Sequence, residues 1–334
     1  MTRTALVTGA SGFIGYHTAK ALLDAGWRVV GIDSLSPYYD VSLKEQRQAM
    51  LMQSPQFSIL NDRIEARAAL HGLFEEHRPD LVIHLAAQAG VRHSITAPRD
   101  YVEANLIGAF ELLEAARAFP PKHMLLASTS SVYGANPSMP YAEVDKSDTQ
   151  MSFYAATKKA TENMAHSYAH LYDLPITMFR FFTVYGPWGR PDMAHFKFTR
   201  AILDGNPIDV YNHGKLQRDF TYIDDLLDAV LALINVVPDP ANPVAHDSIS
   251  PVAPFRVVNI GNSKPVKLMD FITAIENACR REAIKTFRDM QPGDVLATWA
   301  DTRLLHSLIG PRPMTPLAEG LQRFVDWYRD YYKM

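Results

Sequence analysis

The sequence predicts an α/β fold in which a doubly wound parallel sheet is followed by a smaller mixed α/β region. Short apolar runs rich in β-branched residues alternate with longer helical patterns through the first half of the chain. Such runs are typical of parallel strands that are buried on both faces. A glycine-rich segment, TGASGFIG, lies where the first run ends and the first helical pattern begins. In a fold of this class, ligands collect at the carboxyl ends of the strands.

The elements of the first half follow in a regular order. Strands are predicted at residues 4–8, 28–33, 56–60, 80–87, 123–128 and 174–182. Helices are predicted between them at residues 14–26, 68–77, 101–119 and 152–174, where apolar residues recur at helical spacing. Gly26 closes the first of these helices.

After about residue 183 the alternation weakens, and proline, glycine and aromatic residues become more frequent. Residues 238–255 are rich in proline and have no periodicity, which predicts a surface loop. Strand character returns at 255–262, and helices are predicted at 268–283 and 317–332.

The composition argues against several classes of function. The chain has 334 residues, of which 47% are hydrophobic and 21% charged, and its net charge is −3. This balance gives no reason to expect a nucleic acid or an anionic membrane as a partner. Cys279 is the single cysteine, and the twelve histidines show no metal-binding spacing, so we expect neither a disulfide nor a metal. The opening residues show no signal-peptide pattern, and no apolar run could span a bilayer, so we expect a cytoplasmic protein.

The glycine-rich segment predicts a dinucleotide site. Gly9 permits a tight turn, Gly12 lets the backbone approach a pyrophosphate, and Gly15 allows close packing of helix on strand. The N–H groups at the start of the following helix then face the phosphates. Asp33 ends the second strand, where a carboxylate accepts hydrogen bonds from ribose hydroxyls and repels a 2′-phosphate, which favours NAD over NADP.

Tyr154 and Lys158 stand four residues apart in the predicted helix 152–174, so their side chains share one face. A phenol normally titrates near pH 10, which makes it a weak base at neutral pH. An ammonium group and a positively charged nicotinamide ring nearby would lower that pKa. The pair therefore predicts a general base beside a hydride acceptor.

Several motifs together resemble the extended short-chain dehydrogenase/reductase family that acts on nucleotide sugars. They are the glycine loop, LAAQAGVR (85–92), SSVYG (130–134) and YAATK (154–158). Four later motifs are similar to those of UDP-glucuronate 4-epimerases, namely RFFTVYGPWGRPDM (180–193), DVYNHGKLQRDFTYIDD (209–225), NIGNS (259–263) and QPGDV (291–295). The resemblance covers nearly the whole chain.

The resemblance implies a catalytic cycle in which Tyr154 removes the proton of the sugar 4-hydroxyl while tightly bound NAD accepts the hydride from C4. Lys158 would tune the tyrosine, and Thr129 would hydrogen-bond O4. The 4-keto sugar then turns over, and the hydride returns to its other face. The cofactor contacts implied are Gly9, Ser11, Gly12, Phe13, Ile14, Gly15, Asp33, Asp62, Leu85, Ala86, Ala87, Asn105, Tyr154 and Lys158.

On the substrate side, the resemblance implies that Arg218 anchors the diphosphate and Asp294 the uridine ribose, and that Phe196 and Lys197 contact the uracil and diphosphate. Tyr211 is a further implied substrate contact. Residues 1–183 would form the NAD-binding Rossmann domain, which also receives segments near 221–237 and 256–262, and 184–334 would mainly bind the UDP-sugar. Relatives dimerise through two long helices, which residues 106–119 and 153–172 would supply here.

The loop after the fifth predicted strand distinguishes related activities. Related dehydratases carry an Asp-Glu pair before Val-Tyr-Gly and related decarboxylases a glutamate, whereas this chain has Ser130 and Ser131. A glucuronate oxidised at C4 is a β-keto acid, which loses CO₂ when the breaking bond aligns with the carbonyl π system. We expect Thr129, Ser130, Ser131 and Thr183 to hold the carboxylate out of that alignment, with Arg190 adding cationic recognition.

The predicted function is therefore 4-epimerisation of UDP-glucuronate to UDP-galacturonate, with NAD as the cofactor and a homodimer as the assembly. A UDP-glucose or UDP-N-acetylhexosamine 4-epimerase, a UDP-glucuronate decarboxylase and a catalytically silent NAD-binding scaffold stay open as alternatives. Such scaffolds often lack the tyrosine or the lysine, and both are present here.

Overall fold

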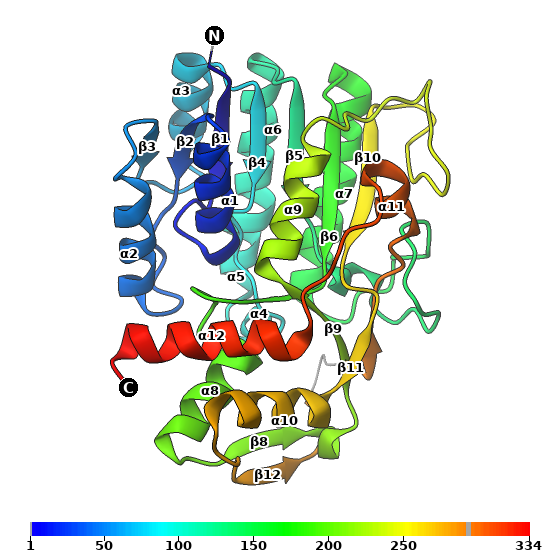
Figure 1. The fold of residues 1–334 in the computed structure, drawn as a ribbon. Helices are drawn as coiled ribbons and strands as arrows, with labels where there is room; N and C mark the ends of the chain where they lie inside the picture. The colour runs from blue at the N-terminus through cyan, green and yellow to red at the C-terminus, as the bar shows by residue number, and fades with distance from the viewer. Residues whose placement is uncertain (1, 292–294) are drawn as a thin grey trace.

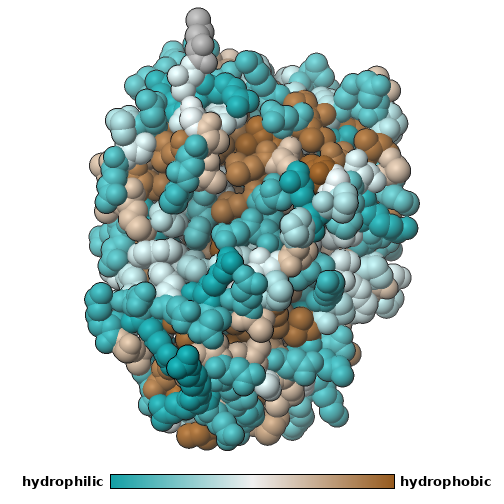
Figure 2. Space-filling model, in the orientation of Figure 1, coloured by the Kyte–Doolittle hydropathy of each residue, from teal (hydrophilic) through white to brown (hydrophobic). Residues whose placement is uncertain are grey.

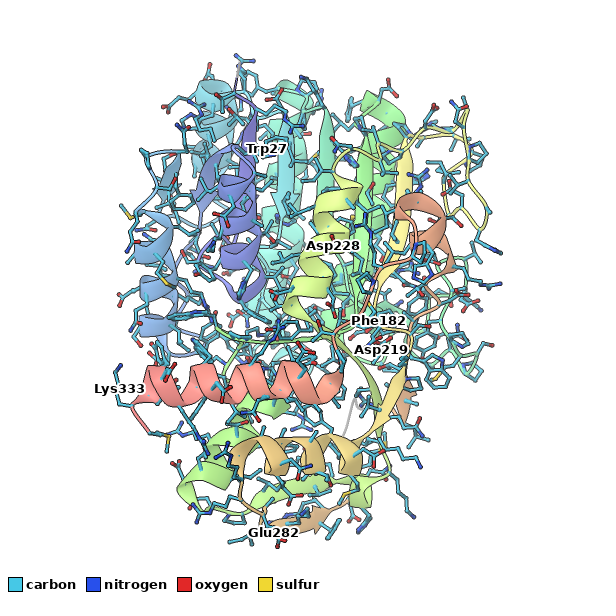
Figure 3. The ribbon with its side chains drawn as sticks, in the orientation of Figure 1. Trp27, Phe182, Asp219, Asp228, Glu282 and Lys333 are labelled. Carbon is cyan, nitrogen blue, oxygen red and sulfur yellow. The ribbon has the colours of Figure 1, made fainter. Side chains whose placement is uncertain are left out.

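The computed structural model describes residues 2–291 and 295–334. Figure 1 shows a large sheet covered by helices, a smaller lobe beneath it, and the last helix, α12 (Leu317–Tyr332), running between the two. Figure 3 places Trp27 and Asp228 among the side chains of the large layer, Asp219 and Phe182 near the junction, and Glu282 at the far end of the small lobe.

The large sheet has seven strands, all paired in parallel. In spatial order they are β10 (Phe255–Ile260), β6 (Ile176–Phe181), β5 (His123–Ala127), β4 (Leu81–His84), β1 (Thr4–Thr8), β2 (Arg28–Ile32) and β3 (Phe57–Leu60). The order reverses beside β1, so this is the doubly wound α/β sheet that the sequence predicts.

Both faces of the sheet are buried, because successive side chains of a strand point to opposite sides. Ala5 and Val7 belong to one hydrophobic cluster, while Leu6 between them belongs to another. Helices from both ends of the chain complete the first cluster, including α1 (Phe13–Asp24) and α9 (Ile223–Leu233). The second cluster is completed by α3 (Arg67–His77), α6 (Gly108–Ala118) and α7 (Phe153–Tyr172).

The small lobe combines short strands with two helices. β9 (Gln217–Tyr222) pairs with β7 (Thr183–Tyr185), β11 (Pro265–Lys267) and β13 (Ala297–Thr298), and β8 (Ile208–Tyr211) pairs with β12 (Lys285–Arg288). α8 (Ala194–Asp204) and α10 (Leu268–Cys279) pack against each other. α11 (Arg303–Ile309) lies against α9 and β10.

Three local features differ from the sequence prediction. Residues 41–51 form α2 (Val41–Leu51), which the sequence analysis left without an element. The predicted helix 101–119 is interrupted, because α4 (His93–Thr96) and α5 (Pro98–Tyr101) lead into a π-helical segment, η1 (Val102–Ile107), before α6 begins. The small lobe is also more regular than its weak periodicity indicates, because its elements are short and pair with distant segments.

The proline-rich segment holds neither helix nor strand between residues 235 and 254, as expected for a loop. The part of the chain that the structure describes contains no helix that is both long and apolar enough to cross a membrane. Figure 2 shows a largely polar face with apolar patches between the polar side chains.

Candidate active site

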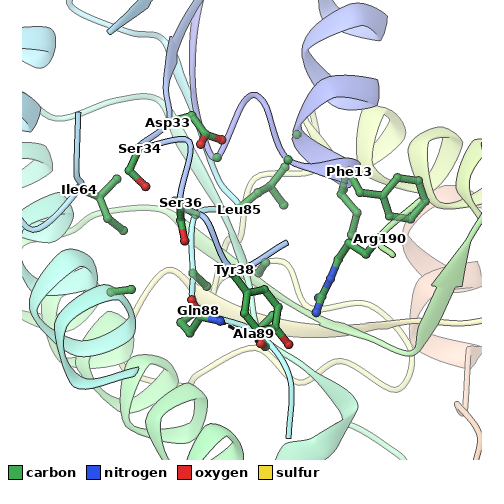
Figure 4. A pocket seen from close by; sticks show the side chains of 18 of the residues that line it. Phe13, Asp33, Ser34, Ser36, Tyr38, Ile64, Leu85, Gln88, Ala89 and Arg190 are labelled. Atoms are coloured by element: carbon green, nitrogen blue, oxygen red, sulfur yellow. Dashed lines mark hydrogen bonds between the residues drawn. The ribbon is translucent and has the colours of Figure 1, made fainter. Parts of the chain in front are cut away.

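A cavity of about 750 Å³ lies at the carboxyl ends of β1, β2, β4 and β5. Figure 4 shows that Asp33, Leu85 and Arg190 reach this space from different segments of the chain. Of the predicted site residues, the lining includes Gly9, Gly12, Phe13, Ile14, Gly15, Asp33, Asp62, Leu85, Ala86, Ala87, Thr129, Tyr154, Lys158 and Arg190. The structure therefore brings the glycine loop, the tyrosine–lysine pair and one arginine to a single cavity.

The glycine loop forms a cradle that no larger residue fits. Gly9 has a φ of +72°, a conformation that favours glycine. A Cβ at Gly15 would lie 1.9 Å from the carbonyl oxygen of Gly9, so helix α1 reaches the loop only because residue 15 has no side chain. Gly12 precedes the first turn of α1, whose N–H groups open toward the cavity edge. This cradle fits the pyrophosphate of a dinucleotide.

Ser11 is fully buried behind the loop rather than in the cavity lining. Its backbone N–H donates to Oδ2 of Asp33 at 3.0 Å, and its hydroxyl donates to Gln48 at 2.9 Å. The other oxygen of Asp33 accepts from the N–H of Leu35 at 2.9 Å. Ser11 therefore orients Asp33, which borders the cavity where the second strand ends.

Lys44 is a cavity residue that the sequence analysis missed, since helix α2 was not predicted. Its ammonium donates to the carbonyl of Ser36 at 2.8 Å. Burial lowers the pKa of Lys44, while the charge of Asp33 acts to raise it. Asp33 and Lys44 thus border the same part of the cavity, in which a ribose would lie.

The adenine end of the cavity is bordered by the exposed residues Asp62 and Arg63 and by the buried Ile64. Asn105 does not border the cavity, and its direct contact with the cofactor stays a prediction. Its side-chain amide is buried in η1, where it accepts from the N–H of Gln88 at 2.8 Å and donates to Thr157 at 3.0 Å. Asn105 therefore fixes the segment after β4 against α7.

Lys158 lies one turn after Tyr154 on α7, and both side chains border the cavity. The Lys158 ammonium is 4% exposed and donates to the carbonyl of Ala127 at 2.8 Å. Burial lowers the pKa of Lys158 to about 8, while the Glu162 carboxylate acts to raise it. The hydrogen bond fixes the ammonium at the end of β5.

The surroundings of Tyr154 differ from the sequence prediction in one respect. Burial raises the pKa of the Tyr154 phenol above its ordinary value. A hydrogen bond with Thr129 and the positive charge of Arg190 act to lower that pKa. Thr129 and Arg190 therefore both favour the phenolate.

The four hydroxyls after β5 do not all face the cavity. Thr129 caps the short 3₁₀ helix η2 (Ser130–Tyr133), accepting from the N–H of Ser131 at 3.2 Å. Ser128 donates its hydroxyl to Glu162 on α7 at 2.6 Å. Thr129 and Ser128 border the cavity, whereas Ser130 and Ser131 lie outside its lining. Thr183 begins β7 and is partly buried, also outside that lining.

Arg190 projects into the cavity (Figure 4). The carboxylate of Asp192 is its partner. Its Nε and Nη2 donate to Asp192 at 3.0 and 2.6 Å, and Tyr38 donates to the same carboxylate at 3.3 Å. The ion pair raises the pKa of Arg190 and lowers that of Asp192, so both stay charged at neutral pH. The Arg190 guanidinium meets the cavity as one half of an ion pair rather than as a lone cation.

Among the described residues, the other predicted substrate contacts Phe196, Lys197, Tyr211 and Arg218 lie outside this lining. Phe196 is 2% exposed and packs against Phe324 and Tyr328 of α12, so its ring is part of the core, and the uracil contact stays a prediction. Lys197, on the next position of α8, is exposed. Tyr211 ends β8, where the Arg92 guanidinium lies 4.8 Å from its ring centre.

Arg218 lies on β9 of the small lobe and donates to the carbonyls of Gln217 at 2.8 Å and of Leu296 at 3.3 Å. The structure thus shows where the predicted diphosphate anchor is held, at the edge of strand β13. Asp294, predicted to bind the uridine ribose, lies outside the described residues.

The NAD dependent epimerase/dehydratase family matches residues 5–244 of this sequence. This match covers more than half of the chain and includes the glycine loop, Thr129, Tyr154, Lys158 and Arg190. The chain belongs to the NAD dependent epimerase/dehydratase family. Arg47, which the sequence analysis did not single out, supports the shared fold here by donating to the glycine loop at Ser11 and to the carbonyl of Trp188.

This family member is similar to proteins of known or inferred activity. It is 54% identical over 332 residues to a probable UDP-glucuronate 4-epimerase of Rhizobium meliloti, covering 98% of this chain and 97% of the relative. A crystal structure of UDP-glucuronic acid 4-epimerase from Bacillus cereus with UDP-glucuronic acid and NAD matches with a TM-score of 0.88. That match has 32% identity and covers 98% of this chain and 100% of the other.

A UDP-glucose 4-epimerase from Thermotoga maritima, solved with UDP-glucose, matches with a TM-score of 0.86 at 27% identity. It covers 98% of this chain and 99% of its own. The family and the fold are therefore shared by enzymes that act on charged and on neutral sugars, so residues around the cavity must distinguish the two groups.

Proposed function

We propose that this chain catalyses the NAD-dependent 4-epimerisation of UDP-glucuronate to UDP-galacturonate. The single observation that carries the proposal is the meeting of Tyr154, Thr129 and Lys158 at one end of a cavity that begins at the glycine cradle. The hydroxyls of Ser128 and Thr129 and the guanidinium of Arg190, which is paired with Asp192, border the same cavity, and we propose that they favour a uronate carboxylate over a neutral sugar. The 54% identical relative is a probable enzyme of this activity.

The cradle residues fit the cofactor that the family name implies. Gly9, Gly12 and Gly15 would hold its pyrophosphate, and Asp33 with Lys44 would hold its adenosine ribose. Leu85, Ala86 and Ala87 line the wall between these groups and Lys158. When bound, NAD supplies the hydride acceptor and donor at the sugar C4 atom.

The chain's own residues would move the proton. Tyr154 removes the proton of the 4-hydroxyl and later returns it, which makes it the general base and then the general acid. Thr129 holds O4 and stabilises the phenolate through its hydrogen bond to Tyr154. Lys158 donates to the carbonyl of Ala127, and it would hydrogen-bond the nicotinamide ribose.

The hydroxyl loop and Arg190 would act on the carboxylate. After oxidation the sugar is a 4-keto uronate, which keeps its CO₂ only while the C5–C6 bond stays out of line with the carbonyl π system. Thr129, Ser130, Ser131 and Thr183 are proposed to hold the carboxylate, and Arg190 to attract it, tempered by its pairing with Asp192. Arg218, Lys197, Tyr211 and Asp294 stay proposed contacts of the UDP portion.

We also propose the wider setting of the enzyme. Residues 1–183, with segments near 221–237 and 256–262, would bind NAD, and 184–334 would mainly bind the UDP-sugar. A homodimer is supported by apolar side chains exposed on adjacent helices, with Phe110 on α6 43% exposed and Leu171 on α7 62% exposed. We propose a cytoplasmic location and a role in polysaccharide biosynthesis.

The test is incubation of the purified protein with UDP-glucuronate, without added NADH, followed by separation of the nucleotide sugars. We expect UDP-galacturonate to appear and CO₂ release to be minor. Exclusive formation of a UDP-pentose with CO₂ would instead make the protein a decarboxylase. A preference for UDP-glucose in competition with UDP-glucuronate would instead make the protein a UDP-glucose 4-epimerase, the activity of the similar Thermotoga maritima enzyme. No turnover of any of these sugars would favour the silent scaffold.

A further inference from the structure

The first serine of the hydroxyl loop is already committed to a partner within the protein. Ser128 is 4% exposed, and its hydroxyl donates to Oε1 of Glu162 at 2.6 Å. Its backbone N–H donates to the carbonyl of Phe179 on β6. Ser128 therefore links the loop after β5 to helix α7 and to strand β6, directly before Thr129.

Both carboxylate oxygens of Glu162 accept hydrogen bonds from neighbouring side chains. The side chain is 2% exposed, on the turn of α7 that follows Lys158. Arg180 donates to both of its oxygens, from Nε at 2.9 Å and from Nη2 at 2.8 Å. Lys159 donates to Oε2 at 3.1 Å from the outer side. The carboxylate is thus held in one orientation.

Arg180 is fixed in turn by groups away from the cavity. It lies on β6, three positions before Thr183, and donates to the carbonyl of Glu143 at 3.1 Å. Its guanidinium also stacks on the ring of Tyr133, the residue that ends η2, at 4.7 Å from the ring centre. The same arginine therefore contacts the end of the short helix that carries Ser130 and Ser131, and it is linked to the residues before that helix through Glu162 and Ser128.

A buried ion pair is weak evidence for stability, since an apolar pair of similar volume often serves the fold as well. Charged hydrogen bonds, however, fix distance and angle more narrowly than apolar contacts do. Here the Glu162 carboxylate joins α7, which carries Tyr154 and Lys158, to β6 through Arg180 and to the loop that carries Thr129 through Ser128. What it fixes is the relative position of those two segments.

We propose that Glu162 is a positioning residue which, through Ser128 and Arg180, holds the hydroxyl loop in place against Tyr154, and that this hold keeps the oxidised uronate from losing CO₂. The proposal rests on the epimerase function proposed above. Glu162 acts through other residues and touches neither the sugar nor the cofactor.

Loss of CO₂ from the 4-keto uronate competes with its epimerisation. The C5–C6 bond of the 4-keto uronate breaks, its electron pair moves into the C4 carbonyl, and CO₂ leaves. The resulting enolate takes a proton at C5, and return of the hydride to C4 gives a UDP-pentose. A loop that rotates by a small amount lets the carboxylate approach the alignment that this step needs, whereas proton transfer at Tyr154 continues.

The experiment compares two serine substitutions within the same hydrogen-bond network. Ser128→Ala removes the link between the loop and Glu162 but leaves the Glu162–Arg180 pair intact. Ser147→Ala is the matched control, because the Ser147 hydroxyl accepts from the same arginine at 3.4 Å but has no contact with the loop. Each holoenzyme is incubated with UDP-glucuronate, and UDP-galacturonate, UDP-pentose and CO₂ are measured together.

We expect the ratio of CO₂ to UDP-galacturonate to rise about fivefold or more in Ser128→Ala, the scale on which one lost hydrogen bond acts. We expect Ser147→Ala to keep the wild-type ratio. The kcat for epimerisation should fall in Ser128→Ala with little change in KM. Glu162→Gln should shift the ratio in the same direction, and if it does not fold, Ser128→Ala alone decides.

Equal product ratios for Ser128→Ala, Ser147→Ala and the wild type would overturn the positioning role. So would a loss of activity in Ser128→Ala without any change in the ratio, since that pattern marks a purely structural contact. Failure of the wild type to epimerise UDP-glucuronate would instead refute the proposed function, so the two failures are told apart by the wild-type reaction alone.

Discussion

The cofactor side and the sugar side of the cavity differ in whether the backbone or side chains form them. On the cofactor side the lining is largely backbone, supplied by the glycine loop and by the segment that follows β4. On the sugar side the predicted contacts are long side chains from segments far apart in the chain, such as Arg190 and Arg218. The cofactor side of the cavity is therefore shaped by the backbone. On the sugar side, Arg190 is paired with Asp192, and Arg218 lies outside the cavity lining.

A site formed by the backbone depends on the absence of side-chain atoms, whereas a site formed by side chains depends on their presence. A methyl group added to the cofactor side has nowhere to go, while a side chain removed from the sugar side leaves its surroundings intact. Four substitutions test this contrast, from the largest expected effect to the smallest.

Tyr154→Phe tests the point at which the two halves meet. Loss of the phenolic hydroxyl removes the group that carries the proton, and turnover should fall by about 10²–10⁴-fold. Epimerisation rate and thermal unfolding are measured together, and unfolding should change little. Tyr168→Phe is the matched control on the same helix, because its hydroxyl contacts Glu114 at 2.6 Å outside the cavity. Turnover within twofold of wild type in Tyr154→Phe would remove Tyr154 from the mechanism.

Gly15→Ala should break the cofactor half. The added methyl group would lie 1.9 Å from the Gly9 carbonyl oxygen and 2.7 Å from its carbon, so the loop must move. Overpacking of this kind costs about 1–3 kcal/mol or more in the free energy of unfolding. We also expect loss of bound NAD, measured by its release on denaturation.

The matched control is Gly72→Ala on helix α3, where an added Cβ meets no atom within 4 Å. It should raise the free energy of unfolding by about 0.5–1 kcal/mol, because glycine weakens a helix interior. Full NAD content in Gly15→Ala would show that the cradle tolerates a side chain and would refute the backbone account.

Lys158→Met should stabilise the cofactor-free protein while abolishing turnover. The pKa of Lys158 is lowered to about 8, so below that pH the folded state carries a buried charge that costs stability on the order of 2–3 kcal/mol. Glu162 on α7 and the buried, neutral His84 on β4 are the other titratable groups whose charges are coupled to this ammonium. The cost should disappear as the pH rises from about 8 toward the ordinary lysine value near 10.5.

Denaturant unfolding at pH 7 and at pH 10 measures the difference between Lys158→Met and the wild type. The variant should be more stable at pH 7, and the gap should shrink at pH 10. A gap that widens with pH would contradict the sign of the shift and show that the ammonium stabilises the fold.

Arg218→Met should have the smallest effect of the four. If the guanidinium binds the diphosphate, its loss should raise KM for the UDP-sugar by about 10-fold, as expected for one charged hydrogen bond, with kcat nearly unchanged. Arg288→Met is the control, because this exposed arginine of the same lobe pairs with Asp209 at 3.0 Å. Steady-state kinetics over a range of UDP-glucuronate decide it, and an unchanged KM would place the anchor elsewhere.

The cofactor half could be predicted from the sequence because its signals are local. The spacing of Gly9, Gly12 and Gly15, the position of Asp33 and the helical interval between Tyr154 and Lys158 each depend on neighbouring residues only. The structure places all of these at one cavity. Lys44 and Arg47 were missed, since helix α2 has too few apolar residues for its period to stand out.

The sugar half was harder to predict because its geometry depends on distant partners. The sequence HFKF does not say which aromatic faces α12, and the structure turns Phe196 inward and Lys197 outward. Asp192 is only two residues after Arg190, but its carboxylate also accepts from the distant Tyr38, which the local sequence does not show. Likewise the serine run does not show that its first member is bound to Glu162, thirty-four residues later.

The π-helical turn η1 has a consequence for chain length. Its wide winding lets Asn105 hold Gln88 with its side chain while its carbonyl accepts from Thr161 on α7 at 3.1 Å. Removing any one residue from 102–107 would force ordinary α-helical winding, which turns the two flanks by about 100° relative to each other. Asn105 could then face only one of its partners. We therefore expect deletions within residues 102–107 to disrupt the fold, and deletions within the loop at 238–254 to be tolerated.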